Sequence, residues 1–175
     1  MHDDLTANLL GALATALSDR SQQGFEPLSP SSAAALLTLR HHGPLATTAL
    51  AAILNLSQPA ATRLLDRLEA EGLVARKAEA AGRSVPLALT AAGRRRAERL
   101  QAARLAASRR ALEALSTAER GTLHKLLAKA LGGLTEDRSQ ARHLCRFCDH
   151  GLCDGPACPV GSAAGEKERR DAAGA

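Results

Sequence analysis

The chain has 175 residues, and its 23 Lys and Arg against 18 Asp and Glu leave a formal net charge of +5, which permits binding to nucleic acids without proving it. Hydrophobic residues form 45% of the chain, enough for the core of one folded domain, which excludes a disordered protein. No apolar run is long enough to span a membrane, and Asp3 and Asp4 stand where a signal peptide needs positive charge, so we expect a cytoplasmic protein.

Leu, Ala, Val and Ile must form the core, because aromatic residues are only 1% of the chain, and this composition favours helices. A first helix is expected over residues 4–19, where leucines recur at every fourth position. A polar linker over residues 21–30 separates it from a second helix over residues 31–41. His41 and His42 at the end of this helix are expected to interact with the helix dipole there.

Residues 45–54 and 57–71 predict two further helices joined by a tight turn. Leu50, Ile53 and Leu54 would face the core from the first of them. Two helices in this arrangement form a helix-turn-helix, whose second helix enters the major groove of DNA. The alternative is an ordinary helical hairpin with a solvated charged face.

The second of these helices has two different faces. Ser57 is its expected N-cap, and Gly72 supplies the left-handed residue at which it ends. Its apolar face comprises Ala61, Leu64, Leu65 and Leu68. Small and cationic groups dominate the other side, which a helix can present to a DNA groove: Pro59, Thr62, Arg63, Asp66 and Arg67.

A hairpin is predicted directly after this helix, from strands over residues 73–76 and 85–89. It would form a wing that carries three cations: Arg76, Lys77 and Arg83. A basic wing beside a helix-turn-helix favours DNA binding over the plain helical hairpin.

The motif "L-x-x-x-L-x-L-S-Q-P-A-A-T-R-L-L-D-R-L-E-A-E-G-L-V-A-R", followed by "L-x-L-T-A-A-G", resembles the MarR family of winged-helix transcriptional regulators. The match runs over residues 50–93, and weaker similarity in helix order extends to about Leu134. The wing departs from the family pattern, because the usual Asp before the arginine is absent from the turn Ala81-Gly82-Arg83. In the family, the terminal helices interdigitate across a two-fold axis, so the resemblance implies a homodimer.

Two helices are expected after the wing, the first over residues 90–115. Arg94, Arg95 and Arg96 at its start form either a solvated face or a set of DNA phosphate contacts. Ser116-Thr117-Ala118-Glu119 reads as a capping box that opens the second helix. That helix carries an apolar stripe of Leu123, Leu126, Leu127, Ala130, Leu131 and Leu134.

The four cysteines of the chain lie in one short loop with the spacing C-x2-C-x4-C-x4-C: Cys145, Cys148, Cys153 and Cys158. Four thiolates at such spacings can bind one metal, and Gly151 and Gly155 would let the loop fold around it. The spacing is similar to that of a zinc knuckle, whereas the closing Cys158-Pro159 resembles bacterial ferredoxin loops. We therefore expect zinc or an iron–sulfur cluster, a choice that the sequence leaves open.

The cysteines have other possible roles. His143 and His150 flank them and could substitute as ligands. Two disulfides are disfavoured in the cytoplasm. A redox pair at Cys145 and Cys148, with thiolates favoured by Arg142, His143 and Arg146, would leave the other two cysteines without a role.

The sequence as a whole predicts a mainly α protein with a small β-wing, that is, a winged helix-turn-helix domain plus a helical dimerisation region. The expected parts are an N-terminal dimerisation helix and linker (1–30), the DNA-binding domain (31–93), C-terminal dimerisation helices (94–140), the metal-binding loop (141–162) and a disordered tail (163–175). No nucleophile–base pair, phosphate loop or paired-carboxylate site indicates an enzyme.

The predicted function is that of a transcriptional regulator, expected to be a repressor, which binds double-stranded DNA as a homodimer and senses redox or iron status through its cysteines. The alternatives are a regulator with structural zinc that responds to a small molecule, and a redox or metal-handling protein that does not bind DNA. Base edges would be contacted by Gln58, Thr62 and Arg63 beside Pro59, and phosphates by Ser57, Arg67, Lys77 and Arg83.

Overall fold

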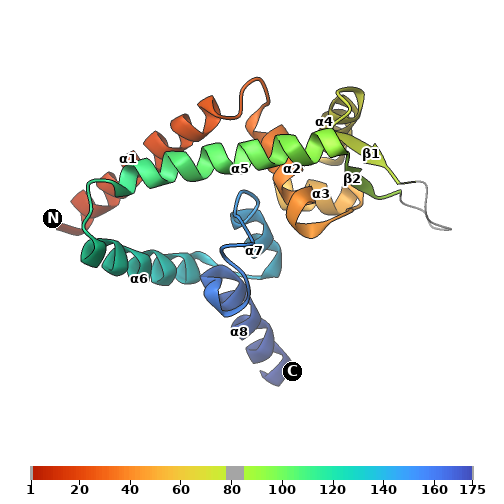
Figure 1. Cartoon of the computed structure of the whole chain (residues 1–175). Coiled ribbons are helices and arrows are strands. Elements are labelled where there is room, and N and C mark those ends of the chain that lie inside the picture. The colour runs from red at the N-terminus through yellow and green to blue at the C-terminus, as the bar shows by residue number, and fades with distance from the viewer. Residues whose placement is uncertain (1, 78–84, 175) are drawn as a thin grey trace.

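The computed structural model describes residues 2–77 and 85–174, in which helices dominate and one two-stranded antiparallel sheet stands at one end of the molecule (Figure 1). The predicted fold class, mainly α with a small β-wing, is confirmed. The elements are α1 (His2–Gln23), α2 (Pro30–His42), α3 (Thr47–Leu54), α4 (Gln58–Ala70), β1 (Val74–Arg76), β2 (Leu87–Leu89), α5 (Ala91–Leu112), α6 (Thr117–Leu134), α7 (Arg138–Leu144), the 3-10 helix η1 (Gly155–Ala157) and α8 (Pro159–Gly174).

Helix α2 is the centre of the fold. Every position from Ser32 to Leu39 is buried, because α5, α3, α4 and β2 all pack against this helix. Its short run of alanines lets these neighbours approach closely, and Leu36 and Leu37 are fully buried. The core is built mainly from aliphatic side chains, as the composition predicts, with Phe25 buried in it and Phe147 partly buried against it.

The helix-turn-helix forms at the predicted place. Leu50, Ile53 and Leu54 of α3 are buried, as expected. Asn55 adopts a left-handed conformation with φ of 54°, which ends α3 and lets α4 begin three residues later. Gly72, with φ of 69°, ends α4 in the same way, and the chain turns into β1.

The wing is fixed to the start of α5 by Thr90 and Gly93. The Thr90 hydroxyl accepts a hydrogen bond from the Gly93 N–H at 3.0 Å and donates one to the Gly72 carbonyl at 2.6 Å. A Cβ at position 93 would lie 1.9 Å from the carbonyl oxygen of Leu73, so only glycine fits there. This contact explains why the Leu-Thr-x-x-Gly sequence follows the wing.

Several element limits differ from the prediction. Helix α1 continues to Gln23, so the linker before α2 is shorter than expected. Helix α3 begins at Thr47 rather than at residue 45, because Leu45 pairs with Leu87 in an antiparallel bridge. The second strand begins at Leu87, two residues later than expected.

Residues 163–174 of the tail, which was predicted to be disordered, are helical in the structure and belong to α8. Its first turns pack Val160 and Ala164 against Ala141 of α7, which forms a small second core. An ion pair joins Glu168 to Arg138 at 2.6 Å. The sequence pattern did not reveal these contacts, because the partner residues lie outside the tail itself.

Two leucine-rich helix faces lie exposed in the single chain. On α1 they are Leu5, Leu9, Leu10 and Leu13, and on α6 they are Leu126, Leu127, Leu131 and Leu134. Helix α6 has no buried residue, although the predicted Ser116–Glu119 capping box does open it. Within residues 2–77 and 85–174, no helix combines the length and the apolar character needed to cross a lipid bilayer.

Candidate nucleic-acid interface and cysteine site

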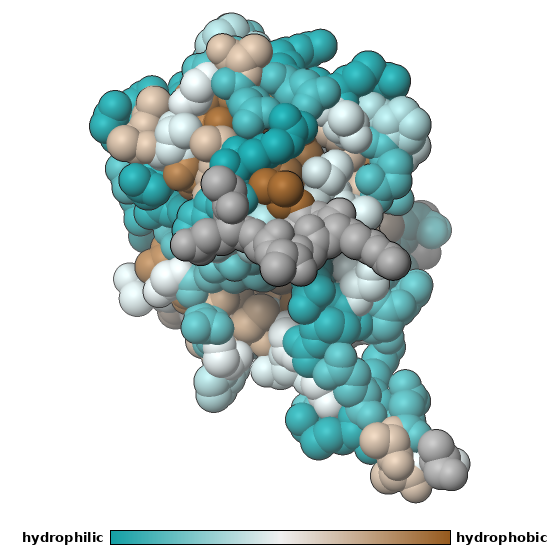
Figure 2. All heavy atoms as spheres, turned by 90° about the vertical axis from the view of Figure 1, so that its right-hand side faces the viewer, coloured by the Kyte–Doolittle hydropathy of each residue, from teal (hydrophilic) through white to brown (hydrophobic). Residues whose placement is uncertain are grey.

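Helix α4 presents the predicted reading face to solvent. Its apolar side is turned inward, with Ala61, Leu65 and Leu68 buried and Leu64 half-buried. All the helix residues predicted to meet DNA are exposed: Ser57, Gln58, Pro59, Thr62, Arg63 and Arg67. Figure 2 shows that mostly hydrophilic residues cover the end of the molecule that carries the wing.

The start of α4 differs in one detail from the prediction. Ser57 occupies the N-cap position, with φ of −64° and ψ of 151°, but its side chain does not cap the helix. The first N–H groups of α4 therefore keep their capacity to donate hydrogen bonds, and the positive end of the helix dipole favours an anion there. This end of the helix suits a phosphate.

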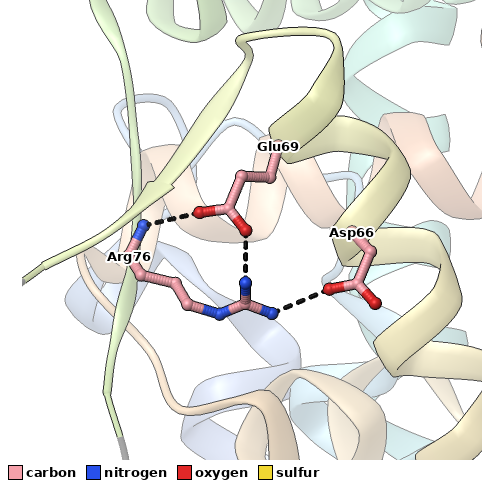
Figure 3. A network of polar contacts seen from close by, with 3 residues as sticks. All are labelled: Asp66, Glu69 and Arg76. Atoms are coloured by element: carbon pink, nitrogen blue, oxygen red, sulfur yellow. Dashed lines mark hydrogen bonds and ion pairs between the residues drawn. The ribbon is translucent and has the colours of Figure 1, made fainter.

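Arg76 joins the wing to α4, because its guanidinium lies between two acidic side chains of that helix, as Figure 3 shows. Its guanidinium binds Asp66 at 2.7 Å and also pairs with Glu69, and its backbone N–H donates to Glu69 at 3.3 Å. The hydrogen bond to Asp66, together with the charge of Glu69, raises the pKa of Arg76. Arg76 was predicted as one of the wing cations, without this network. The available signal was the pair of acidic side chains at i and i+3 of α4, Asp66 and Glu69, before an arginine in the next strand.

The other predicted cations differ in their exposure and in their contacts. Lys77 is exposed at the end of β1, whereas Arg83 lies outside the described residues. Arg96 turns inward and donates to the carbonyls of Phe25 and Glu26, both at 2.7 Å. Arg95 is exposed, so only part of the arginine run at the start of α5 remains available to phosphates.

All four cysteines line one cavity of about 510 Å³, which His42 and His150 also border. They are free thiols, and each is half-buried. In the described parts of the chain, no three His, Cys, Asp or Glu side chains already stand as a metal-binding group. The donor set itself, four thiols around one space, fits a thiophilic metal such as zinc or iron.

The thiols interact in pairs. Cys145 donates a hydrogen bond to Cys148, which with the charge of Arg104 lowers the pKa of Cys148 to about 6. The same bond raises the pKa of Cys145. Burial, with the nearby Cys158, raises the pKa of Cys153 to about 11. The cation beside Cys148 is thus Arg104 of α5, which lies too far from the cysteines in sequence for their local pattern to indicate it.

Histidine and phenylalanine side chains attach the cysteine loop to the DNA-binding domain, and His143 and His150 are the two among them predicted as possible alternative ligands. His143 Nδ1 lies 2.8 Å from the carbonyl oxygen of Ile53. The His150 ring stacks on His41, with centroids 4.6 Å apart. Phe147 stacks on Phe25 at 5.6 Å.

A second cavity, of about 370 Å³, lies between α1, α5 and the cysteine loop. Phe25 and Phe147 form part of its wall, and the guanidinium groups of Arg104 and Arg146 both lie near the Phe147 ring, at 5.8 and 5.1 Å from its centroid. Ser18, Ser21 and Gln22 add polar groups. The cavity thus has both apolar and cationic groups in its wall.

A family model described as MarR family matches residues 28–81. A MarR family protein from Bacillus stearothermophilus is 27% identical, covers 77% of this chain and 96% of its own, and superposes with a TM-score of 0.70. No curated protein matches the chain.

Two proteins of Mycobacterium tuberculosis are also similar in structure. The MarR family protein RV2887, in complex with salicylic acid, is 31% identical, covers 70% of this chain and 93% of its own, and has a TM-score of 0.56. RV1404 is 27% identical over 77% of this chain and 94% of its own, with a TM-score of 0.67.

Proposed function

The chain belongs to the MarR family of transcriptional regulators, and on this premise we propose that it is a repressor that binds a near-palindromic DNA operator as a homodimer. The observation that carries the proposal is the exposed face of α4, on which hydrogen-bonding and cationic side chains stand clear of the core. Such a regulator acts where the chromosome is, so we place it in the cytoplasm.

In this proposal α4 enters the major groove. Gln58, Thr62 and Arg63 read base edges, because amide, hydroxyl and guanidinium groups match the donors and acceptors displayed there. Ser57, Arg67, Lys77 and Arg83 position the helix on phosphates. The ion pairs of Arg76 hold the wing beside α4, so that both elements meet the DNA together.

The exposed leucines of α1 and α6 support the homodimer. Leu5, Leu9 and Leu10 are each more than half exposed in the single chain, as are Leu126 and Leu134. Burying such faces against a second copy is favourable, at about 25 cal/mol per Å² of apolar surface. A dimer would also place two recognition helices about one DNA turn (~34 Å) apart, as a near-palindromic operator requires.

We propose in addition that Cys145, Cys148, Cys153 and Cys158 hold a metal centre. An iron–sulfur cluster there would supply sensitivity to oxidants or iron status, whereas zinc would order the loop. The cavity that all four thiols share supports the centre. An absorption spectrum with metal analysis, on protein purified without oxygen, distinguishes the two: visible absorption with iron and sulfide, or a colourless sample with about one zinc per chain.

A second candidate signal is a small anionic molecule. The cavity beside Arg104 and Arg146 favours it, and RV2887 is a MarR family protein seen in complex with salicylic acid. In this alternative the cysteine centre is structural zinc, and the small molecule controls DNA binding.

A gel shift with DNA from around the gene for this protein tests the regulator proposal. We expect a shift at nanomolar to micromolar protein that weakens steeply with added salt, because cationic side chains displace counterions from DNA. A shift that is absent, or that does not respond to salt, would favour a redox or metal-handling protein that does not bind DNA.

A further inference from the structure

The strongest unexplained feature is the set of contacts between the cysteine loop and the back of the helix-turn-helix. We propose that His143 and His150 are positioning residues, through which the occupancy of the cysteine centre sets the placement of α4 and so the affinity for DNA. The inference rests on the proposed function, because it names how the same centre regulates the same DNA-binding face.

The first contact completes the C-terminal end of α3. The last four carbonyls of an α-helix have no partner within the helix. In α3 the Ala52 carbonyl accepts the N–H of Asn55, and the Ala51 carbonyl accepts the N–H of Leu56. The Ile53 carbonyl is met instead by His143, at 2.8 Å. Because a carbonyl oxygen can only accept, the imidazole must carry its proton on Nδ1.

Ile53 is a sensitive place for such a contact. It stands four residues before Ser57 and five before Gln58, where α4 begins. The turn between them is tight, with Asn55 held in a left-handed conformation. A shift of the α3 end is therefore carried directly to the first turn of α4, which holds the residues proposed to meet DNA.

The other end of this connection is the cysteine site. His143 lies two residues before Cys145, in the last turn of α7. The backbone N–H of Cys145 bonds to the Ala141 carbonyl at 3.0 Å, and that of Cys148 to the Cys145 carbonyl at 2.8 Å. His143 and the first cysteine pair thus belong to one hydrogen-bonded segment, which must move together.

The second contact reaches the base of the wing. His150, between Cys148 and Cys153, stacks on His41 with an interplanar angle of 6° and meets His42 edge-on, with centroids 5.0 Å apart. His41 and His42 end α2, and three residues later Leu45 pairs with Leu87 of β2.

Buried Gln101 strengthens this second contact. Its side-chain oxygen accepts from His41 Nε2 at 3.3 Å, and its nitrogen donates to the Phe147 carbonyl at 3.4 Å. The residue is 3% exposed, so both bonds are shielded from water. The loop that carries the cysteines is therefore joined to α2 and α5 by hydrogen bonds as well as by ring contacts.

These contacts are few and local, which suits a switch. The small core of α7 and α8 is separate from the main core. Phe147 of the cysteine loop packs against the main core. Binding of all four thiols to one metal would replace the Cys145–Cys148 and Cys153–Cys158 hydrogen bonds, and so would change the loop that lines the cavity between them. His143 and His150 pass that change to α3 and α2.

The test compares operator binding by chelator-stripped protein with binding after the same sample is reloaded with Zn²⁺. We expect the two dissociation constants of the wild-type dimer to differ roughly 5- to 150-fold, the range usual for coupling between sites. The backbone amides of Asn55 and Leu56 should also change their hydrogen exchange when zinc is added. This second measurement does not depend on DNA.

His143→Ala should still take up zinc on its four cysteines, yet bind the operator with nearly the same affinity in both states. His124→Ala is the matched control, because His124 is an exposed histidine on α6, and it should keep the wild-type difference. Should His143→Ala fail to fold by circular dichroism, His150→Ala replaces it, since it removes the ring stack and leaves the Ile53 contact.

The possible failures are distinguishable. Wild-type protein that binds zinc and operator with equal affinity in both states overturns this inference and leaves the proposed function standing. Loss of the zinc effect in His124→Ala as well would also overturn it, because the effect would then not depend on His143. A wild-type protein that never binds the operator overturns the proposed function. One that never binds zinc overturns the proposed metal centre. Either result also overturns this inference.

Discussion

The guanidinium of Arg76 and the carboxylate of Asp66 lie 2.7 Å apart, and this ion pair joins the first strand of the wing to the outer side of the recognition helix. Glu69 completes the network from the next turn of the helix. The charge on Arg76 is thus directed toward the protein. Its effect on DNA binding should be indirect, through the angle between wing and helix.

Arg76→Ala should lower the free energy of unfolding by no more than about 1 kcal/mol, because partly exposed ion pairs contribute little to stability. Operator affinity should fall more than this, since the wing loses its attachment to α4. A double-mutant cycle with Asp66→Ala, measured by chemical unfolding and by DNA titration, checks both effects. Equal, additive losses from the two single variants would contradict the network.

Arg63→Ala should weaken specific binding by roughly 1–3 kcal/mol and relax the preference at one base pair. Lys77→Ala should instead weaken binding to all sequences. It should also reduce the slope of the logarithm of the binding constant against the logarithm of salt concentration by about one. Both are measured by titrating operator and mutated operator over a salt series. Arg109→Ala is the control, because Arg109 is an exposed arginine far along α5, and it should leave both the affinity and the salt dependence unchanged. An Arg63→Ala protein with unchanged affinity and base preference would refute the assignment of Arg63.

Leu9→Glu and Leu126→Glu should convert the dimer to a monomer at micromolar concentration, as light scattering would show. The two leucines are 60% and 59% exposed in the single chain. A carboxylate at either position therefore costs the isolated fold little, but it opposes burial in an interface. Val85→Glu, on an exposed apolar residue of the wing, should remain dimeric. A wild-type protein that is monomeric under these conditions would disprove the proposed assembly.

Ser116→Ala should destabilise α6 by about 1 kcal/mol, a typical loss for an N-cap. The Ser116 hydroxyl and N–H both bond to Glu119, which lowers the pKa of that carboxyl. The stability from this bond is therefore present above the ordinary Glu value of 4.5 and is lost as the pH falls through the lowered pKa. Thermal unfolding against pH, with Ser108→Ala as a non-capping control, measures it.

Cys148→Ser and Cys153→Ser should each reduce bound metal and increase hydrogen exchange in α7 and α8, because the proposed centre would hold the loop between these helices. Metal analysis and exchange on protein purified without oxygen check the two effects together. Ser162→Ala, beside the last cysteine, is the control. Full metal content in both cysteine variants would contradict a centre built on four thiols.

Much of the fold could be predicted because its signals are short. The apolar spacing of α4, the left-handed Gly72 and the Ser116–Glu119 capping box each involve residues within one or two turns of each other. The ends of the helices and strands were predicted less accurately where a residue pairs with a partner that is distant in sequence. Leu45 belongs to a bridge with Leu87 rather than to a helix, and the C-terminal tail is helical because α7 covers one side of it.

The candidate DNA-reading residues followed from the same local periodicity, which places Gln58, Thr62 and Arg63 on the side of α4 opposite its buried leucines. Arg76 did not follow, because a free cation and an ion-paired one look alike in sequence. The spacing of the cysteines predicted one shared site, and the structure gathers all four around one cavity. Which metal they would hold depends on the final arrangement of the donors.

By itself the sequence determined the winged helix-turn-helix and its exposed reading face, since caps, turns and periodic apolar faces act over a few residues. Only the tertiary structure decided where the cysteine loop lies. The contact from His143 to Ile53 spans 90 residues of sequence and depends on how α7 packs against α3. No local pattern encodes such a distance, because the packing of whole helices, and not the preference of any one segment, brings the two residues together.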